Sequence, residues 1–152
     1  MVTRPKKLLP RSRRHALTRS QVMGRIRSSN TKPERLVRSL VHGLGLRFRN
    51  EARDLPGNPD LVNRSAKWAI FVHGCFWHQH DGCQLASSPR TNTSYWTAKL
   101  ARNKERDSGS LVALRAMGYR VLVVWECETR ATAPLIRALA AFLRKRSPRP
   151  KK

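Results

Sequence analysis

A chain of 152 residues can bury one hydrophobic core but is short for more than one domain. Its 32 Lys and Arg against nine Asp and Glu give a net charge of +23, which favours a polyanionic partner, with nucleic acid the leading candidate. The odd number of three cysteines argues against a disulfide scaffold, and no secretory signal or apolar run of membrane length is visible. We therefore expect a cytoplasmic monomer in a reducing compartment, with no membrane partner.

Both ends of the chain are strongly basic. Residues 1–35 hold 11 of the 32 basic side chains with Glu34 as their single acid, and the C-terminus adds six more. Residues 1–17 show no apolar periodicity, so we predict a flexible arm there, one folded domain over 18–145 and a basic tail over 146–152. Arms of this kind neutralise phosphates, and their binding weakens as salt rises.

Two capping boxes predict helices near the N-terminus. Thr-Arg-Ser-Gln at residues 18–21 would begin a short helix that ends near Arg27. Thr-Lys-Pro-Glu at residues 31–34 would begin a second helix, because proline is tolerated in a first turn. Gly43 and Gly45 end this second helix, whose apolar residues fall at helical spacing: Leu36, Val37, Leu40 and Val41.

The middle of the chain alternates strands and turns. Residues 46–51 indicate a strand, and a Pro-Gly-Asn-Pro turn at 56–59 leads into a second strand that starts at Asp60. The apolar, aromatic run 67–72 is typical of a buried strand. Residues 73–92 are polar and irregular, and they are too many for a simple connector in so short a chain.

The C-terminal part returns to helix and strand. A long helix is predicted from Thr93 or Ser94 to about Met117, then a buried strand over 119–125 and an amphipathic helix over 134–145. This order predicts an α/β sandwich, with one mixed sheet flanked by helices. The early strands are linked by turns and should be antiparallel, whereas the strand after the long helix should be parallel to its neighbour.

Cysteine and histidine gather in the irregular loop. Cys75, His80 and Cys83 lie within it, and Cys127 follows the last predicted strand. Thiolates with imidazole in a four-member set suit tetrahedral Zn²⁺, and a set without an open position would be structural. Such an ion would tie the loop to the sheet, because the loop has no apolar core of its own. Spacing alone does not decide between His78 and His80 as the histidine ligand.

Pro59-Asp60 at the start of a strand, with another strand behind it, is similar to the active-site hairpin of restriction-type nucleases. A carboxylate there can hold Mg²⁺, which polarises a scissile phosphate and lowers the pKa of an attacking water. The usual acid-x-Lys is absent, since Ile-Phe-Val-His occupies residues 70–73. Imidazole is suited to proton transfer near neutral pH, so His73 and His78 are candidates to replace the lysine.

Three further side chains have competing interpretations. Phe76 and Trp77 would ordinarily pack in a core, but in a polar loop of a basic protein, insertion between DNA bases is an alternative. The ordinary interpretation of Glu34 is the reciprocal cap of Thr31.

Four segments resemble the very short patch repair endonucleases of bacteria. They are Leu-Pro-Gly-Asn-Pro-Asp at 55–60, His-Gly-Cys-Phe-Trp-His at 73–78, Asn-Lys-Glu-Arg-Asp at 103–107 and Val-Trp-Glu-Cys at 124–127. The similarity spans residues 18–128 and implies a bacterial, nucleoid-associated endodeoxyribonuclease of restriction-endonuclease-like fold, with a structural zinc loop. Its reaction would be a Mg²⁺-dependent nick in double-stranded DNA, in the T-containing strand at T:G mismatches left by deamination of 5-methylcytosine.

The resemblance also implies roles for individual residues. Asp60 and the backbone carbonyl of Val72 would hold Mg²⁺, and His78 would act as the base beside the attacking water. His73 and Glu34 would support the phosphate, the water and the metal shell. The intercalating side chains would be Phe76 and Trp77 from one groove and Met23 from the other, and the zinc ligands would be Cys75, His80, Cys83 and Cys127.

The chain departs from the family's pattern at two positions. Val72 stands where the family often has threonine, a change without effect if a backbone carbonyl serves there. The segment between His80 and Cys83 is one residue longer than in some relatives, and a glycine turn at Asp81-Gly82 should absorb the extra residue.

Two other functions fit these residues, namely a restriction-like nickase with another target and a zinc-stabilised DNA-binding module without catalysis. A mismatch-repair protein is a candidate further partner.

Overall fold

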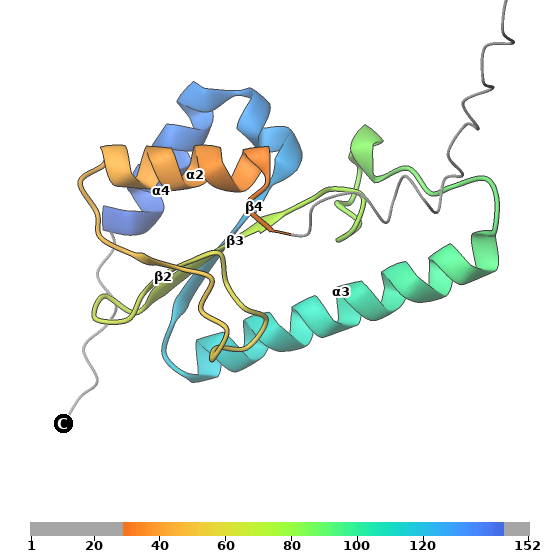
Figure 1. Ribbon diagram of the computed structural model, residues 1–152, viewed down its shortest axis with the longest axis horizontal. Helices are drawn as coiled ribbons and strands as arrows, with labels where there is room; N and C mark the ends of the chain where they lie inside the picture. The colour runs from red at the N-terminus through yellow and green to blue at the C-terminus, as the bar shows by residue number, and fades with distance from the viewer. Residues whose placement is uncertain (1–28, 145–152) are drawn as a thin grey trace, which may run out of the picture.

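The computed structural model describes residues 29–144. The helix predicted over 18–27, with Met23 on it, and the basic segments 1–17 and 146–152 lie outside the described residues. The described elements follow one another in the order α2 (Lys32–Gly43), β1 (Arg49–Asn50), β2 (Leu61–Asn63), β3 (Trp68–His73), η1 (Gln84–Ala86), α3 (Thr93–Ala116), β4 (Arg120–Trp125), η2 (Glu126–Arg130) and α4 (Thr132–Arg144) (Figure 1).

The four strands form one mixed sheet in the order β1-β2-β3-β4. The pairs β1–β2 and β2–β3 are antiparallel, and β4 lies parallel to β3 after the crossover through α3. This confirms the predicted α/β class and the mixed sheet. The strand predicted over 46–51 is wrong in extent, because only Arg49–Asn50 pairs regularly with β2. Glu51 leaves the regular strand conformation at a φ of +49°, although its N–H still donates to the Asp60 carbonyl at 3.2 Å.

The sheet carries a hydrophobic layer on each face. In Figure 1, α2 and α4 lie together on one side of the strands and α3 runs along the other side. Successive residues of β2 point to opposite faces, so Leu61 joins the first layer and Val62 the second. In β3 the same alternation divides Ile70 from Ala69 and Phe71. The sheet is therefore buried on both faces, as the apolar run 67–72 predicted.

Helix α2 begins as its capping box predicts. Thr31 is the N-cap, and its hydroxyl oxygen accepts a hydrogen bond from the Glu34 N–H at 3.5 Å, with Pro33 in the first turn. The helix therefore begins with Glu34 in its first turn, where this residue lines the cavity described in the next subsection. No helix within residues 29–144 is long and apolar enough to cross a lipid bilayer.

Candidate active site

A cavity of about 630 Å³ opens where β3 ends, and it brings the four predicted catalytic residues together. Side chains from α2, β3, the loop after β3 and the middle of α3 surround it. Its lining comprises Glu34, Gly57, Asn58, Asp60, Phe71, Val72, His73, His78, Arg106, Asp107, Ser110 and Leu111.

Asp60 stands directly before β2, with its carboxylate against β3. The backbone N–H of Val72 donates a 2.7 Å hydrogen bond to Asp60 Oδ2. Burial raises the pKa of Asp60 to about 6; the Val72 hydrogen bond opposes this shift, the nearby Glu34 carboxylate adds to it, and Arg38 opposes it. A carboxylate that is ionised at neutral pH but poorly solvated gains strongly from a bound cation. Asp60 is therefore suited to hold a divalent metal.

Glu34 is buried at the edge of the same cavity, and its carboxylate is fully engaged. It accepts hydrogen bonds from the Asn30 N–H at 2.7 Å and from the Thr31 hydroxyl at 2.8 Å. Arg38 Nη2 forms an ion pair with it at 3.1 Å. The ordinary interpretation of Glu34 as a partner of Thr31 and its placement at the cavity are thus compatible, since one carboxylate does both.

His73 and His78 stack on each other, with ring centroids 3.8 Å apart and planes 8° from parallel. His73 is the last residue of β3 and is 7% exposed. Burial lowers its pKa to about 4, the neighbouring His78 and then Arg106 lower it as well, and Asp107 opposes them. His73 is therefore a neutral imidazole at physiological pH.

Asp107, from the middle of α3, contacts His78 through Oδ2 and Nδ1. A carboxylate on one ring nitrogen fixes the tautomer and leaves the other nitrogen, Nε2, to accept a proton. One candidate ligand atom from each of His73, His78 and Asp107 lies within 4.8 Å of the other two, close enough to surround an ion. Parallel stacked rings, however, direct their nitrogen lone pairs into separate planes, which favours proton transfer over chelation by both rings.

The four predicted zinc ligands meet on the other side of the loop. Ligand atoms of Cys75, His80, Cys83 and Cys127 all lie within 4.8 Å of one another. His80 Nδ1 is 3.3 Å from Cys127 Sγ and 3.7 Å from Cys75 Sγ. These distances bracket the edge of about 3.6 Å expected for tetrahedral zinc with Zn–S near 2.3 Å and Zn–N near 2.0–2.1 Å. The residues present therefore fit the ion, and His80 rather than His78 lies among the thiols.

Burial keeps the Cys75 sulfur protonated in the absence of a metal. It raises the pKa of the Cys75 thiol to about 12, so binding of zinc there would release the thiol proton. The turn between His80 and Cys83 contains Gly82 at φ +72°, a left-handed conformation that suits glycine and agrees with the expected glycine turn.

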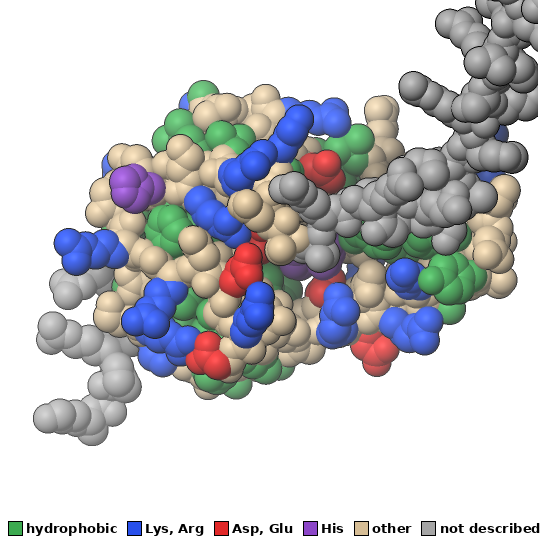
Figure 2. Space-filling view, viewed as in Figure 1, with side chains coloured by type: hydrophobic (Ala, Val, Ile, Leu, Met, Phe, Trp, Pro, Cys, Tyr) green, Lys and Arg blue, Asp and Glu red, His purple; other side chains and the backbone are tan. Residues whose placement is uncertain are grey.

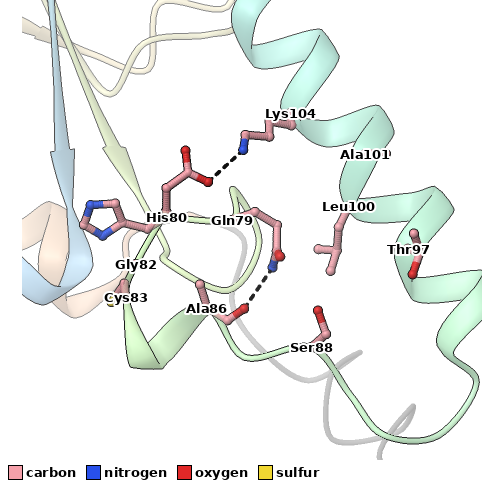
Figure 3. Close-up of a pocket in the computed structure, with 11 residues that line it drawn as sticks. Gln79, His80, Gly82, Cys83, Ala86, Ser88, Thr97, Leu100, Ala101 and Lys104 are labelled. Atoms are coloured by element: carbon pink, nitrogen blue, oxygen red, sulfur yellow. Dashed lines mark hydrogen bonds and ion pairs between the residues drawn. The ribbon is translucent and has the colours of Figure 1, made fainter.

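Polar contacts, together with the aromatic contacts described below, hold this loop against α3. A cavity of about 400 Å³ lies between them. In Figure 3 the Gln79 side chain points toward α3 and the His80 ring points away from it. Lys104 Nζ forms an ion pair with Asp81 at 2.9 Å, and Asn103 Nδ2 donates to the Trp77 carbonyl at 3.2 Å. Within the loop, Gln79 Nε2 donates to the Ala86 carbonyl at 3.4 Å. The loop is therefore fixed from two sides, by the Cys/His cluster and by α3.

Comparison with known proteins identifies the family. A family model described as DNA mismatch endonuclease Vsr matches residues 14–84. The chain is 49% identical over 110 residues to the type II nicking enzyme V.XorIIP of Xanthomonas oryzae pv. oryzae, covering 72% of this chain and 80% of the relative. It is 43% identical over 118 residues to the DNA mismatch endonuclease Vsr of Escherichia coli K12, covering 78% and 75%. This chain belongs to the Vsr family. It is accordingly an endonuclease.

In this Vsr-family chain the predicted intercalating residues are part of a larger aromatic cluster. Phe76 packs edge-on against Trp77 at 5.0 Å and against Trp96 at 5.6 Å. Trp96 belongs to the first turn of α3, where Tyr95 packs on it at 5.4 Å and is 49% exposed. Lys99 Nζ lies 5.5 Å from the Trp96 ring centroid. The cluster combines buried and exposed rings, so packing and DNA contact are compatible.

Sequence reasoning missed Asp107, Tyr95 and Trp96 as members of the site. Asp107 stands in the segment 103–107 that resembles the family, but no role was inferred for it. Whether Asp107 faces His78 depends on how α3 packs against the loop, and the spacing of residues in the sequence does not reveal this. Tyr95-Trp96 at the start of a helix in a basic chain was the available signal for the aromatic cluster.

Basic side chains cover the surface around the site. Figure 2 shows Lys and Arg side chains spread across the face of the molecule seen there, with several acidic ones between them. Residues 29–144 hold 18 Lys and Arg against nine Asp and Glu, and on this face the basic side chains do not gather in one patch. Such a surface attracts a polyanion from many directions.

Proposed function

We propose that this chain is a Mg²⁺-dependent DNA endonuclease that nicks the T-containing strand at T:G mismatches arising from 5-methylcytosine deamination, and so begins very short patch repair. The observation that carries the proposal is a partly buried carboxylate, Asp60, in one cavity with the stacked His73–His78 pair and Asp107. The mixed sheet with helices on both faces is compatible with a restriction-endonuclease-like fold. Family membership supports the mismatch as substrate.

Asp60 would hold the metal ion together with the backbone carbonyl of Val72. When bound, Mg²⁺ supplies charge stabilisation at the scissile phosphate and lowers the pKa of the attacking water. His78 accepts the proton of that water at Nε2, while Asp107 at Nδ1 orients the ring and stabilises its charged form. Because Val72 would serve through its backbone carbonyl, valine in place of the family's threonine leaves these roles unchanged.

His73 and Glu34 would support the site rather than transfer protons. The low pKa of His73, about 4, keeps its ring neutral, so it can stack on His78 without repelling the imidazolium that forms there. Glu34 adds a negative charge near Asp60, which strengthens the attraction of the site for a divalent cation.

The zinc ion would be structural, held by Cys75, His80, Cys83 and Cys127. Its position orders the loop that carries His78 and the two intercalation candidates, Phe76 and Trp77. These rings, with Met23 from the opposite groove, would insert beside the mismatch. A mispaired step unstacks at lower cost than a matched one, which favours T:G duplexes.

A mismatch-repair protein stays a proposed further partner, and the segments 1–17 and 146–152 stay proposed phosphate-binding arms.

A restriction-like nickase with a different target is the second candidate. Five relatives carry the name "type II nicking enzyme", V.XorIIP among them, which favours it as an alternative. A zinc-stabilised module without catalysis is disfavoured, because the cavity contains every proposed catalytic side chain.

A panel of duplexes separates these candidates. The purified protein with Mg²⁺ should nick a T:G duplex in preference to matched, A:C and G:G duplexes of the same sequence, and Asp60→Ala should bind but not cleave. Equal cleavage of the matched duplex would favour the altered-target nickase. Binding without cleavage by the wild-type chain would contradict the catalytic assignment.

A further inference from the structure

Trp125 lies between the two groups of histidines. One face of its indole stacks on His80, with centroids 4.2 Å apart and planes 4° from parallel. Its ring meets His73 edge-on at 5.4 Å and 74°. Since His73 in turn stacks on His78, four rings form a continuous series from the metal cluster to the cavity.

The backbone holds Trp125 firmly in this place. It is the last residue of β4 and pairs in parallel register with His73, the last residue of β3. Its N–H donates to Glu128 Oε2 at 2.7 Å within the turn η2. In the same turn, Glu126 Oε2 accepts a 3.4 Å hydrogen bond from the N–H of Cys75. The indole is thus anchored at its backbone, and its ring is held by the two histidines.

We propose that Trp125 is a positioning residue that couples the Cys/His metal cluster to the catalytic histidine pair. A ligated His80 ring is fixed in its plane, and it holds the indole in one orientation. The indole in turn contacts the buried His73 ring and limits its movement, and His78 stacks on that ring. Loss of the metal would free the His80 ring, and the Trp125 indole would lose the contact that fixes its orientation. The cluster therefore controls catalysis as well as the fold of the loop.

A second route between the same sites exists in the chain itself, because Gly74 alone separates His73 from Cys75. Coupling through this backbone would not need the indole. Substitution of Trp125 in the metal-loaded protein therefore distinguishes the two routes, since it leaves the backbone and all four ligands in place. Phe at this position keeps an aromatic face and should retain most of the coupling, whereas Ala should abolish it.

The first readout requires no DNA. In the zinc-loaded protein, the imidazole Cε1–Hε1 NMR signals of His73 and His78 should shift in Trp125→Ala and stay near their wild-type positions in Trp125→Phe. Zinc release to a chromogenic chelator should be faster by ~10-fold or more in Trp125→Ala, the usual scale for loss of a group that supports a metal ligand. Leu135→Ala, a substitution of a buried core residue in α4, is the control for simple destabilisation.

The second readout is nicking, and it rests on the proposed function. Trp125→Ala should lower the single-turnover rate at saturating T:G duplex by ~10-fold or more without weakening DNA binding. The proposal is overturned if Trp125→Ala keeps wild-type imidazole signals and rates, or if its losses, corrected for the folded fraction, equal those of Leu135→Ala. If the wild-type chain fails to nick, the proposed function fails, and the NMR and zinc-release results still decide the coupling.

Discussion

His78 and Asp107 are 29 positions apart in sequence, yet Nδ1 of one contacts Oδ2 of the other. The contact joins the metal-binding loop to the middle of α3. It gives this loop histidine a fixed tautomer, whose Nε2 can accept a proton. The proposed chemistry depends on this pair more than on any other contact of the site.

Asp107→Asn should lower kcat for nicking by roughly 10²–10⁴-fold, because an amide no longer stabilises the charged imidazole and can favour the wrong tautomer. DNA binding should change little, since Asp107 holds His78 and not the phosphate. Single-turnover cleavage with a parallel binding assay measures both. Glu105→Gln, an exposed acid on the same helix, is the matched control. A rate for Asp107→Asn equal to that of this control would contradict the pairing.

Asp60→Asn should stabilise the magnesium-free, zinc-loaded protein above neutral pH. The pKa of Asp60 is raised from 3.8 to about 6, so the stability that its proton provides is present below about pH 4 and is lost as pH rises through about 6. The neutral amide avoids this loss, which corresponds to about 2–3 kcal/mol at pH 8. Urea unfolding of both proteins between pH 5 and pH 8 should show the difference growing with pH. A variant less stable than wild type at pH 8 would argue against a desolvated carboxylate.

Arg38→Ala should move the pH dependence of nicking upward. Arg38 opposes the rise in the pKa of Asp60 and forms an ion pair with Glu34 at 3.1 Å, so its removal takes away a cation that stabilises both carboxylates. Mg²⁺ binding requires ionised Asp60. As the pH is lowered at limiting Mg²⁺, the nicking rate of the variant should therefore begin to fall at a higher pH than that of wild type. Arg38→Lys should restore the profile in part, and the exposed Arg35→Ala should not change it. An unchanged profile in Arg38→Ala would refute this role.

Cys127→Ser should weaken zinc binding and loosen the loop. Cys127 follows β4 and is the one ligand outside the loop, so its loss detaches the loop from the sheet. A structural zinc contributes directly to folding free energy, and we expect a lower Tm and substoichiometric zinc by metal analysis. Ser110→Ala, whose hydroxyl donates only to the Arg106 carbonyl among the contacts of residues 29–144, is the control. Full zinc content and wild-type Tm in Cys127→Ser would exclude the four-ligand site.

Much of the fold could be predicted because its signals are local. The apolar run 67–72 is β3 almost to the residue, and the helix predicted from Thr93 ends within a residue or two of the observed α3. The strand at 46–51 failed because Phe48 and Leu46 are apolar for packing against the core rather than for pairing, and Glu51 ends the pairing. Periodicity reports burial, and here burial and strand pairing do not coincide.

The candidate site was predictable in its residue types but not in its pairings. The metal set follows from the chemistry of thiol and imidazole, whereas the choice of His80 over His78 depends on the intervening Gln79, whose φ of +50° turns the chain. The partner of His78 depends on how α3 packs across the loop, and such tertiary packing cannot be predicted from local sequence patterns. The roles of Trp125 and Arg38 likewise appear only when separate elements are packed together.

The most direct test of the account is strand-resolved nicking of a T:G duplex with each strand labelled at its 5′ end. With Mg²⁺, wild-type protein should cut only the strand that carries the mismatched thymine, and Asp60→Ala should bind the duplex and leave both strands intact. Cleavage of the G-containing strand at a comparable rate, or a nick by Asp60→Ala at the wild-type rate, would contradict it.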